Sequence, residues 1–242
     1  MRTVAVVLAG GAGHRFGPGP PKQLRLLGGQ TLLGRCVATF GQAAGVSDVL
    51  VVAAAELTGQ VRAELHGLPR LVAVIEGGQA RTDSTQQAIA WLSARSGARG
   101  EADDCKVLFH DAARPLVDPA TIAACISALD RWDAVGVVVP TADTIVELAD
   151  GAFRRVLPRD SLARCQTPQG FRLSVIRRAY ELAAADPEFA ARPATDDCGV
   201  VLRYLPGVPV GAVAGNERNL KVTYPDDLAV ARALLDLADG RD

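Results

Sequence analysis

The chain has 242 residues, with 26 basic and 27 acidic side chains and a formal net charge of −1. This balance argues against a general nucleic-acid-binding protein or a protein of anionic membrane surfaces, because both need an excess of basic residues. At about 150 residues per domain, the length predicts one large domain or two small ones. A chain this long can bury a core without disulfides or a structural metal.

We expect neither a targeting segment nor paired cysteines in this chain. An uncharged run of about 18 apolar residues does not occur, so we expect no membrane span. The N-terminal apolar run lacks a small-residue cleavage site, so we expect no signal peptide. The five cysteines are widely spaced and form no C-x-x-C pair, which predicts reduced thiols in a cytoplasmic protein rather than disulfides or a zinc cluster.

Short β-branched runs alternate with helical patterns in the first part of the chain. The predicted strands cover residues 4–9, 48–53, 71–75, 106–109 and 134–139. The predicted helices cover residues 31–40, 56–66, 83–95 and 119–129, and either Asp83 or Ser84 would cap the third. This alternation predicts right-handed βαβ units and a Rossmann-like α/β fold, with a mostly parallel twisted sheet flanked by helices. Ligands of such sheets bind beyond the carboxyl ends of the strands.

The pattern changes after Pro140, where a hairpin is expected. Residues 144–148 and 153–157 flank the turn signal of Asp150 and Gly151. Because this hairpin carries few core residues, we expect a projecting arm, directed towards a second subunit. The arm would cover about residues 141–167, inserted in a single domain of residues 1–242. Further predictions are helices at 173–185, 196–202 and 225–237 and a polar surface loop at 96–104.

A glycine-rich loop follows the first predicted strand at residues 8–16. Its glycines allow backbone N–H groups to approach a phosphate chain, and Arg15 and Lys22 would add the charge that holds a triphosphate. The alternative is a tight strand-to-helix turn with two solvated cations. The dinucleotide fingerprint is absent, since Phe16 stands where its third glycine belongs. The Walker motif is absent too, since two prolines precede Lys22.

The second motif, residues 110–115, directly follows a predicted buried strand. Asp111 is well placed to bind Mg²⁺, which takes one or two carboxylates together with phosphate oxygens. Arg114 could pair with an anionic substrate. The alternative is a capping turn with the arginine on the surface, and we expect His110 to be packed or capping rather than catalytic.

A third motif joins two glycines at 77–78 to Arg81, Asp83 and Ser84, which could contact a base or ribose. The alternative is a loop with a helix cap. Further polar residues follow later in the chain. Each by itself is typical of a protein surface. They are Thr144, Arg159, Thr167, Thr195 and Lys221. Neither a G-x-S-x-G motif nor a suitable histidine spacing occurs, so hydrolase and zinc chemistry find little support.

Together these motifs resemble the 2-C-methyl-D-erythritol 4-phosphate cytidylyltransferases of non-mevalonate isoprenoid synthesis. The resemblance runs from Val4 to about Leu235. It implies transfer of CMP from CTP to the phosphate of methylerythritol phosphate, with release of pyrophosphate. It also implies Mg²⁺ as cofactor and a homodimer whose arms interlock, so that Thr144 and Arg159 act in the partner's site.

The resemblance also implies a role for each site residue. The residues expected to bind the nucleotide are Leu8, Ala9, Gly10, Gly11, Gly13, Gly78, Arg81, Asp83 and Ser84. The residues expected to act in catalysis are Arg15, Lys22, Arg159 and Lys221. The residues expected to bind the acceptor are Arg114, Thr144, Thr167 and Thr195. Asp111 would hold the metal.

Three alternatives remain open at the level of sequence. A ribitol 5-phosphate cytidylyltransferase shares the motifs and the reaction, and differs in its polyol phosphate acceptor. A guanylyltransferase shares the glycine-rich loop, but the 111–115 run weakens this alternative. A non-catalytic nucleotide-binding regulator would have no need to retain all of the charged residues named above.

Overall fold

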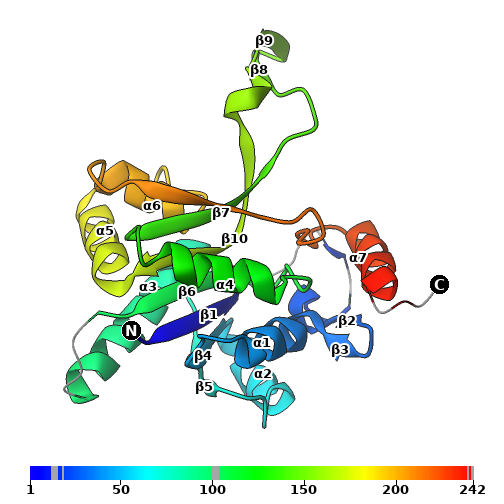
Figure 1. Cartoon of the computed structure of the whole chain (residues 1–242), viewed down its shortest axis with the longest axis vertical. Helices are drawn as coiled ribbons and strands as arrows, with labels where there is room; N and C mark the ends of the chain where they lie inside the picture. The colour runs from blue at the N-terminus through cyan, green and yellow to red at the C-terminus, as the bar shows by residue number, and fades with distance from the viewer. Residues whose placement is uncertain (12–15, 18, 100–103, 239, 241–242) are drawn as a thin grey trace.

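The computed structural model describes residues 1–11, 16–17, 19–99, 104–238 and 240. Within them, seven strands form one sheet in the order β11-β7-β10-β6-β1-β4-β5, with helices on both faces and one hairpin projecting from the body (Figure 1). Of these strands, β10 alone runs antiparallel to its neighbours. The prediction of a Rossmann-like, mostly parallel sheet is therefore confirmed.

The elements of the sheet and its helices have the following bounds. The strands are β1 (Thr3–Ala9), β4 (Asp48–Ala53), β5 (Leu71–Glu76), β6 (Lys106–Asp111), β7 (Ala134–Pro140), β10 (Ala163–Arg172) and β11 (Val210–Ala214). The helices are α1 (Leu32–Gln42), α2 (Thr58–Glu64), α3 (Arg81–Arg99), α4 (Pro119–Ala128), α5 (Leu173–Ala185), α6 (Asp197–Tyr204) and α7 (Pro225–Ala238). The smaller strands are β2 (Leu26–Leu27), β3 (Gln30–Thr31), β8 (Val146–Ala149) and β9 (Ala152–Val156), and the 3-10 turns are η2 (Lys22–Leu24), η3 (Ala55–Leu57) and η4 (Arg159–Ser161).

Strand β1 is buried on both faces, which explains its continuous apolar sequence. Val4 and Val6 pack into the core formed with α3, α5 and α6, whereas Ala5 and Val7 pack into the core formed with α1, α2 and α4. A third, smaller cluster places α7 against the β2–β3 hairpin. The two large cores hold the centre of the sheet rigidly, and with it the loops that follow β1 and β6.

The chain changes direction across the sheet at β1. It runs from β1 outward to β4 and β5, and then returns through α3 to β6 on the other side of β1. Leu8 lies opposite Asp111 in the β1–β6 register, and Ala112 N donates to Leu8 O at 3.0 Å. Such a switch point opens a crevice at the carboxyl ends of the two strands, where ligands of α/β proteins bind.

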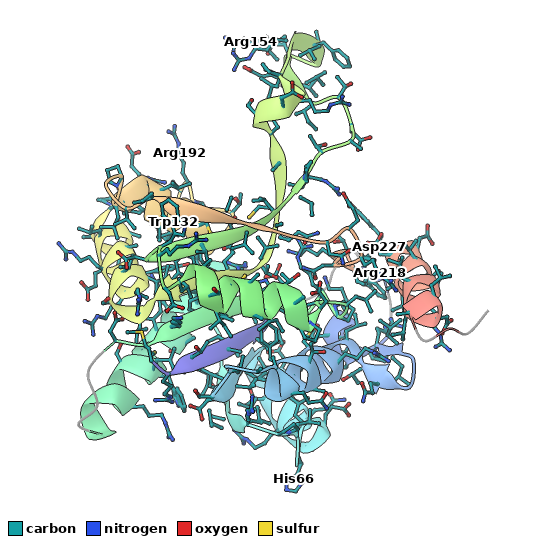
Figure 2. All side chains as sticks on the ribbon, in the orientation of Figure 1. His66, Trp132, Arg154, Arg192, Arg218 and Asp227 are labelled. Atoms are coloured by element: carbon teal, nitrogen blue, oxygen red, sulfur yellow. The ribbon has the colours of Figure 1, made fainter. Side chains whose placement is uncertain are left out.

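The predicted hairpin is confirmed as β8 and β9, which stand away from the sheet (Figure 1). Asp150 and Gly151 have φ values of +50° and +79°, the left-handed pair that a tight hairpin turn needs. Arg154 marks the far end of this arm (Figure 2). Among its apolar side chains, Leu148 is 60% exposed and Phe153 is 75% exposed.

The structure corrects the predicted bounds of α3. The helix begins at Arg81, so neither Asp83 nor Ser84 is its N-cap residue. Asp83 instead sits in the first turn, where its carboxylate accepts from Ala80 N at 2.9 Å and satisfies a free backbone donor from inside the helix. The helix also continues to Arg99, so the expected loop at 96–104 was wrong over its first residues.

Strand β10 was not predicted. Its sequence is mainly polar and contains Pro168, which lies where the pairing with β7 shifts between Gln166 and Gln169. A proline is tolerated in a central strand at such an irregularity, because no ladder hydrogen bond is lost there. The pattern of apolar residues therefore gave no strand signal, although the strand pairs with both β6 and β7.

In the described parts of the chain, none of the helices is both long and apolar enough to cross a membrane. The five cysteines are free thiols, as predicted. Four of them are buried and Cys165 is exposed.

Candidate active site

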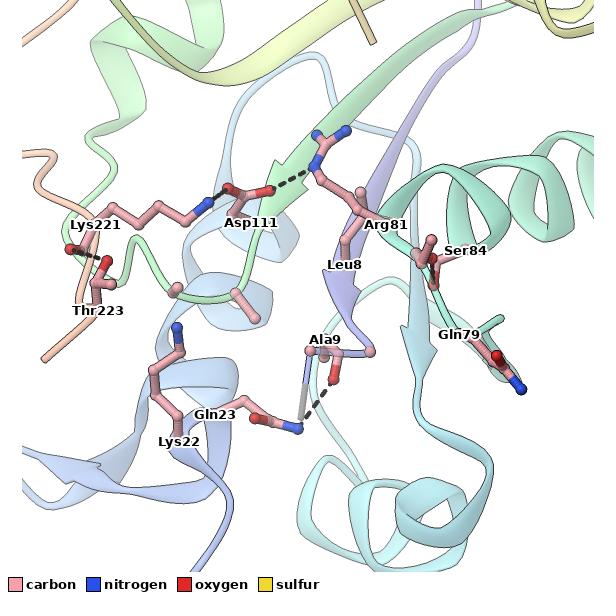
Figure 3. Close-up of a pocket in the computed structure, with 15 residues that line it drawn as sticks. Leu8, Ala9, Lys22, Gln23, Gln79, Arg81, Ser84, Asp111, Lys221 and Thr223 are labelled. Atoms are coloured by element: carbon pink, nitrogen blue, oxygen red, sulfur yellow. Dashed lines mark hydrogen bonds and ion pairs between the residues drawn. The ribbon is translucent and has the colours of Figure 1, made fainter. Parts of the chain in front are cut away.

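A pocket of about 320 Å³ opens at the carboxyl ends of β1 and β6. Its walls include residues 8–11 at and after the end of β1, 22–23 of η2, 79–81 before and within α3, and 111–113 at and after the end of β6 (Figure 3). The predicted site residues that line it are Leu8, Ala9, Gly10, Gly11, Lys22, Arg81, Ser84, Asp111 and Lys221. Segments far apart in the sequence thus meet at the switch point of the sheet.

Asp111 stands between two cations in this pocket. Arg81 Nε lies 3.2 Å from its Oδ1, and Lys221 Nζ lies 2.8 Å from its Oδ2, from the opposite side (Figure 3). Burial alone would raise the pKa of Asp111, but the charges of Arg81 and Lys221 outweigh it and hold that pKa well below its ordinary value. The carboxylate is therefore ionised at neutral pH, and both of its oxygens are engaged.

Arg81 contacts a second carboxylate, to which sequence patterns assigned no role. Its Nη1 lies 2.8 Å from Oδ2 of Asp197, at the first turn of α6. Burial lowers the pKa of Arg81, but Asp197 and Asp111 outweigh this and hold it above its ordinary value. No local pattern joins α3 to α6, so this contact could be found only in the folded chain.

His110 and Thr167 hold the turn that carries Asp111. Because the carbonyl of Arg114 can only accept, His110 Nε2 donates to it at 3.0 Å, which leaves Nδ1 as an acceptor for the Thr167 hydroxyl at 3.0 Å. The same hydroxyl accepts from Asp111 N at 3.1 Å. Burial lowers the pKa of His110 to about 4, so the ring is neutral at pH 7. His110 is packed and hydrogen-bonded, as the sequence analysis expected.

The glycine-rich end of the pocket is crowded around Ser84. A Cβ at Gly77 would lie 2.6 Å from Ser84 Oγ, and one at Gly10 would lie 3.0 Å from it. The two glycine motifs therefore allow the end of β1 and the start of α3 to approach closely. Gln23, which the sequence analysis did not identify, ties this region together by donating from Nε2 to Ala9 O at 3.0 Å (Figure 3).

Some predicted site residues lie outside the walls of this pocket. Gly78 is packed against Asp83, since a Cβ there would lie 2.1 Å from that of Asp83. Arg114 donates to the carbonyls of Asn219, at 2.8 Å, and Cys165, at 3.4 Å. The remaining predicted residues outside it are Asp83, Thr144, Arg159, Thr167 and Thr195. Gly13 and Arg15 lie outside the described residues, and the roles of all of these residues stay predictions.

Two of these residues belong to the arm and its base. Thr144 is exposed just before β8, and Arg159 is exposed in η4 after β9, where its Nη1 donates to Ala142 O at 3.2 Å. Arg159 lines a separate hollow together with Pro140 and Thr141. Within the described part of one chain, these side chains are thus not among those that surround Asp111.

The pocket suits a metal that arrives with phosphates. Among the described residues, histidine, cysteine and carboxylate side chains form no group of three or more that could hold a metal ion. Mg²⁺ in nucleotide sites takes one or two carboxylates and completes its shell with phosphate oxygens and water. The Asp111 carboxylate, facing the glycine-rich end of β1, fits that donor set.

Comparison with known proteins identifies the family. The profile of the 2-C-methyl-D-erythritol 4-phosphate cytidylyltransferases matches residues 3–237. A protein of that name from Thermobifida fusca is 48% identical over 241 residues, which cover 97% of this chain and 93% of the relative.

Two further similar proteins are a solved structure and a relative whose name includes a different acceptor. The crystal structure of a 2-C-methyl-D-erythritol 4-phosphate cytidylyltransferase from Thermus thermophilus is 30% identical, has a TM-score of 0.73, and matches over 95% of this chain and 97% of its own. A bifunctional ribulose 5-phosphate reductase/CDP-ribitol pyrophosphorylase from Haemophilus influenzae is 34% identical over 239 residues, covering 96% of this chain but 48% of that relative. The match over nearly its whole length shows that this chain belongs to the 2-C-methyl-D-erythritol 4-phosphate cytidylyltransferase family.

Proposed function

We propose that this protein transfers the cytidylyl group of CTP to the phosphate of 2-C-methyl-D-erythritol 4-phosphate. One observation carries the proposal: the pocket at the switch point joins a glycine-rich strand end to an ionised carboxylate held between two cations. This arrangement binds phosphates and metal without supplying an acid–base pair. It is therefore suited to phosphoryl chemistry in which charge is stabilised.

The reaction needs no general base, because the acceptor is already an anion. A phosphate oxygen of the acceptor attacks the α-phosphorus of CTP, the bond to the β-phosphate breaks, and the electron pair leaves with pyrophosphate. Backbone amides of residues 8–11 would contact the triphosphate, and Lys22 and Lys221 would neutralise the charge that develops on the α-phosphate. Arg15 is expected to contribute to the same neutralisation.

Asp111 would hold a divalent cation, Mg²⁺ in the first place. When bound, such an ion neutralises phosphate charge and orients the triphosphate for in-line attack. The side chain of Lys221 is 43% exposed, so it can leave the carboxylate for the phosphates without unfolding its surroundings. Asp111 itself is kept in place by the Arg81 contact on its other oxygen.

We further propose that two copies of the chain assemble through the arm. Leu148, Phe153 and Val156 leave an apolar surface on a hairpin that is too small to bury it alone. Thr144 and Arg159 lie on the same projection and outside the pocket of their own chain. A second copy that packs against the arm would receive these side chains in its own acceptor site.

Pyrophosphate release tests the proposed reaction. The assay would contain Mg²⁺ and would pair each nucleotide, CTP or GTP, with each acceptor, methylerythritol phosphate or ribitol 5-phosphate. Fast release with only CTP and methylerythritol phosphate is the expected result. Preference for GTP would overturn the nucleotide assignment, and CTP binding without release in any well would favour a regulatory protein.

Ribitol 5-phosphate is the second candidate acceptor. The Haemophilus influenzae relative, whose name includes a CDP-ribitol pyrophosphorylase, is 34% identical over almost all of this chain. The two polyol phosphates present the same nucleophile, so the pocket around Asp111 would serve either. Release with ribitol 5-phosphate in place of methylerythritol phosphate would keep the mechanism and change the acceptor.

A further inference from the structure

Asp197 is a buried carboxylate that the reaction described above does not use. Its side chain is fully buried, at the first turn of α6, and it does not line the pocket. Its Oδ2 lies 2.8 Å from Nη1 of Arg81, whose Nε contacts Asp111 at 3.2 Å. One guanidinium therefore joins a carboxylate in the pocket to one in the core.

Residues from several elements contact Asp197. Its Oδ1 accepts from the Tyr180 hydroxyl of α5 at 2.7 Å and from the Thr85 hydroxyl of α3 at 3.0 Å. Its backbone N–H donates to Gln169 Oε1 of β10 at 3.0 Å. A buried carboxylate is costly unless it is paired and hydrogen-bonded, and the contacts with Tyr180, Thr85 and Arg81 offset that cost.

The contact between Arg81 and Asp197 is chiefly electrostatic. The Nη1–Oδ2 separation is short, but neither atom makes a well-directed hydrogen bond with the other. The attraction of opposite charges persists in such geometry, because it depends on distance rather than on direction, and it is strengthened by the low dielectric of the core. Asp197 thus offsets part of the positive charge that Arg81 presents to Asp111.

We propose that Asp197 is a positioning residue that, through Arg81, tunes how strongly Asp111 competes for a divalent cation. The proposal rests on the proposed function, since it deepens the role of the same pocket. With Asp197 present, Arg81 is shared between two carboxylates and Asp111 keeps enough free negative charge to accept a metal. Without Asp197, the positive charge of Arg81 is compensated by Asp111 alone, which lowers the affinity of Asp111 for a metal ion.

The two cations that contact Asp111 differ in exposure, which supports different roles for them. The side chain of Arg81 is 24% exposed and is anchored by Asp197, whereas that of Lys221 is 43% exposed. Lys221 can therefore exchange with an incoming cation, while Arg81 stays and sets the charge that this cation meets.

The chain offers a matched control in Asp186. This carboxylate accepts from the Tyr204 hydroxyl at 2.6 Å and from Arg203 Nη2 at 2.8 Å, so it also joins a tyrosine and an arginine. It lies after α5 and away from the pocket walls. Asp186→Asn changes the same chemistry without touching Arg81 or Asp111.

The experiment measures binding of CTP by calorimetry, in excess Mg²⁺ and again in EDTA, without acceptor. The ratio of the affinity for CTP in Mg²⁺ to the affinity in EDTA is called the metal enhancement. Asp197→Asn is expected to lower this metal enhancement about tenfold, a common size for coupling between two sites. Asp186→Asn is expected to leave it unchanged, and a chemical unfolding curve checks that each variant is folded.

Two additional variants keep the test decisive. Tyr180→Phe removes one hydrogen bond to Asp197 at nearly constant shape, so it is expected to lower the enhancement about threefold even if Asp197→Asn does not fold. In an Asp111→Asn background, Asp197→Asn is expected to have no further effect on metal-dependent binding. A further loss in that background would overturn the claim that Asp197 acts through Asp111.

The outcomes separate this inference from the proposed function. Metal-enhanced CTP binding that is equal in wild type, Asp197→Asn and Tyr180→Phe would overturn the inference alone. Wild-type protein that binds no CTP would overturn the proposed function and the inference with it. A lowered enhancement in Asp197→Asn and Tyr180→Phe, with Asp186→Asn unaffected, is the result that the structure predicts.

Discussion

The pocket and the arm both place a carboxylate between two cations, yet the consequences differ. Asp111 is 9% exposed and lies between Arg81 and Lys221 at the end of a core strand. Glu147 lies between Arg154, at 2.8 Å, and Arg155, at 2.5 Å, on the projecting hairpin. The arginines of the arm are about two-thirds exposed, at 67% and 66%. Water screens the second cluster more than the first, so the electrostatic attraction within the Asp111 cluster is the stronger one.

The largest expected difference comes from removing each carboxylate in turn. Asp111→Asn deletes the ionised group proposed to hold the metal and leaves two cations facing each other. We expect kcat to fall on the order of 10³-fold. Glu147→Gln is its matched partner in the arm, with an expected change below about threefold because exposed ion pairs contribute little. Steady-state kinetics would measure both, and equal losses would contradict the distinction between the two regions.

A mixed dimer tests whether the arm completes a pocket in the other subunit. Lys22→Ala and Arg159→Ala are each expected to lower kcat on the order of 10²-fold. A heterodimer of the two, purified through different affinity tags, would have one intact site and one doubly altered site. Its activity should be about half that of wild type, because the symmetry of a dimer places one arm at each pocket.

The parental variants, purified in the same way, provide the baseline for that heterodimer. An activity no higher than the parents would mean that Lys22 and Arg159 serve the same chain. Failure to recover any heterodimer would contradict assembly through the arm.

The pocket, unlike the arm, should make stability depend on pH through His110. Burial holds its pKa at about 4, below the ordinary value of 6.5, so the unfolded chain binds the proton more readily. The free energy of unfolding should therefore be unaffected above about pH 6.5 and fall by about 3 kcal/mol as the pH drops from there to 4. His110→Gln should remove this dependence of the free energy of unfolding on pH. Urea unfolding at several pH values would measure it.

The exposed His66, labelled in Figure 2, provides the control for this measurement. His66→Gln should keep the wild-type slope. An unchanged slope in His110→Gln would show that the buried ring does not set the pH response.

The smallest expected effect concerns the apolar surface of the arm. Phe153→Asp places a charge on a side chain that is 75% exposed in one chain, so the fold and its melting temperature should be preserved. If that surface packs against a second copy, the charge should shift the protein towards monomer in sedimentation and lower kcat/KM about tenfold. Unaltered sedimentation would show that Phe153 is not part of an interface.

Sequence patterns predicted the parts of the molecule that local physics determines. The apolar runs of β1 and β6 identified two central strands, and Asp111 followed from its place at the end of one of them. The hairpin followed from Asp150 and Gly151, because a tight turn needs residues that tolerate positive φ.

The remainder depends on contacts between distant segments. Strand β10 is polar and irregular at Pro168, and it is fixed only by pairing with β6 and β7. The contact of Arg81 with Asp197 joins helices that no spacing rule relates. The hydroxyl of Thr167 bonds His110 and the backbone of Asp111, a use that sequence could not reveal, while its expected contact with the acceptor stays a prediction.

Phosphorus NMR of the complete reaction would test the proposed cytidylyl transfer directly, because it follows each phosphorus atom. Wild-type protein would be incubated with Mg²⁺, CTP and 2-C-methyl-D-erythritol 4-phosphate. A cytidylyltransferase would produce equal amounts of pyrophosphate and a new diphosphate that links the α-phosphorus of CTP to the acceptor phosphate. Release of orthophosphate from CTP, with the acceptor unchanged, would contradict the proposed transfer.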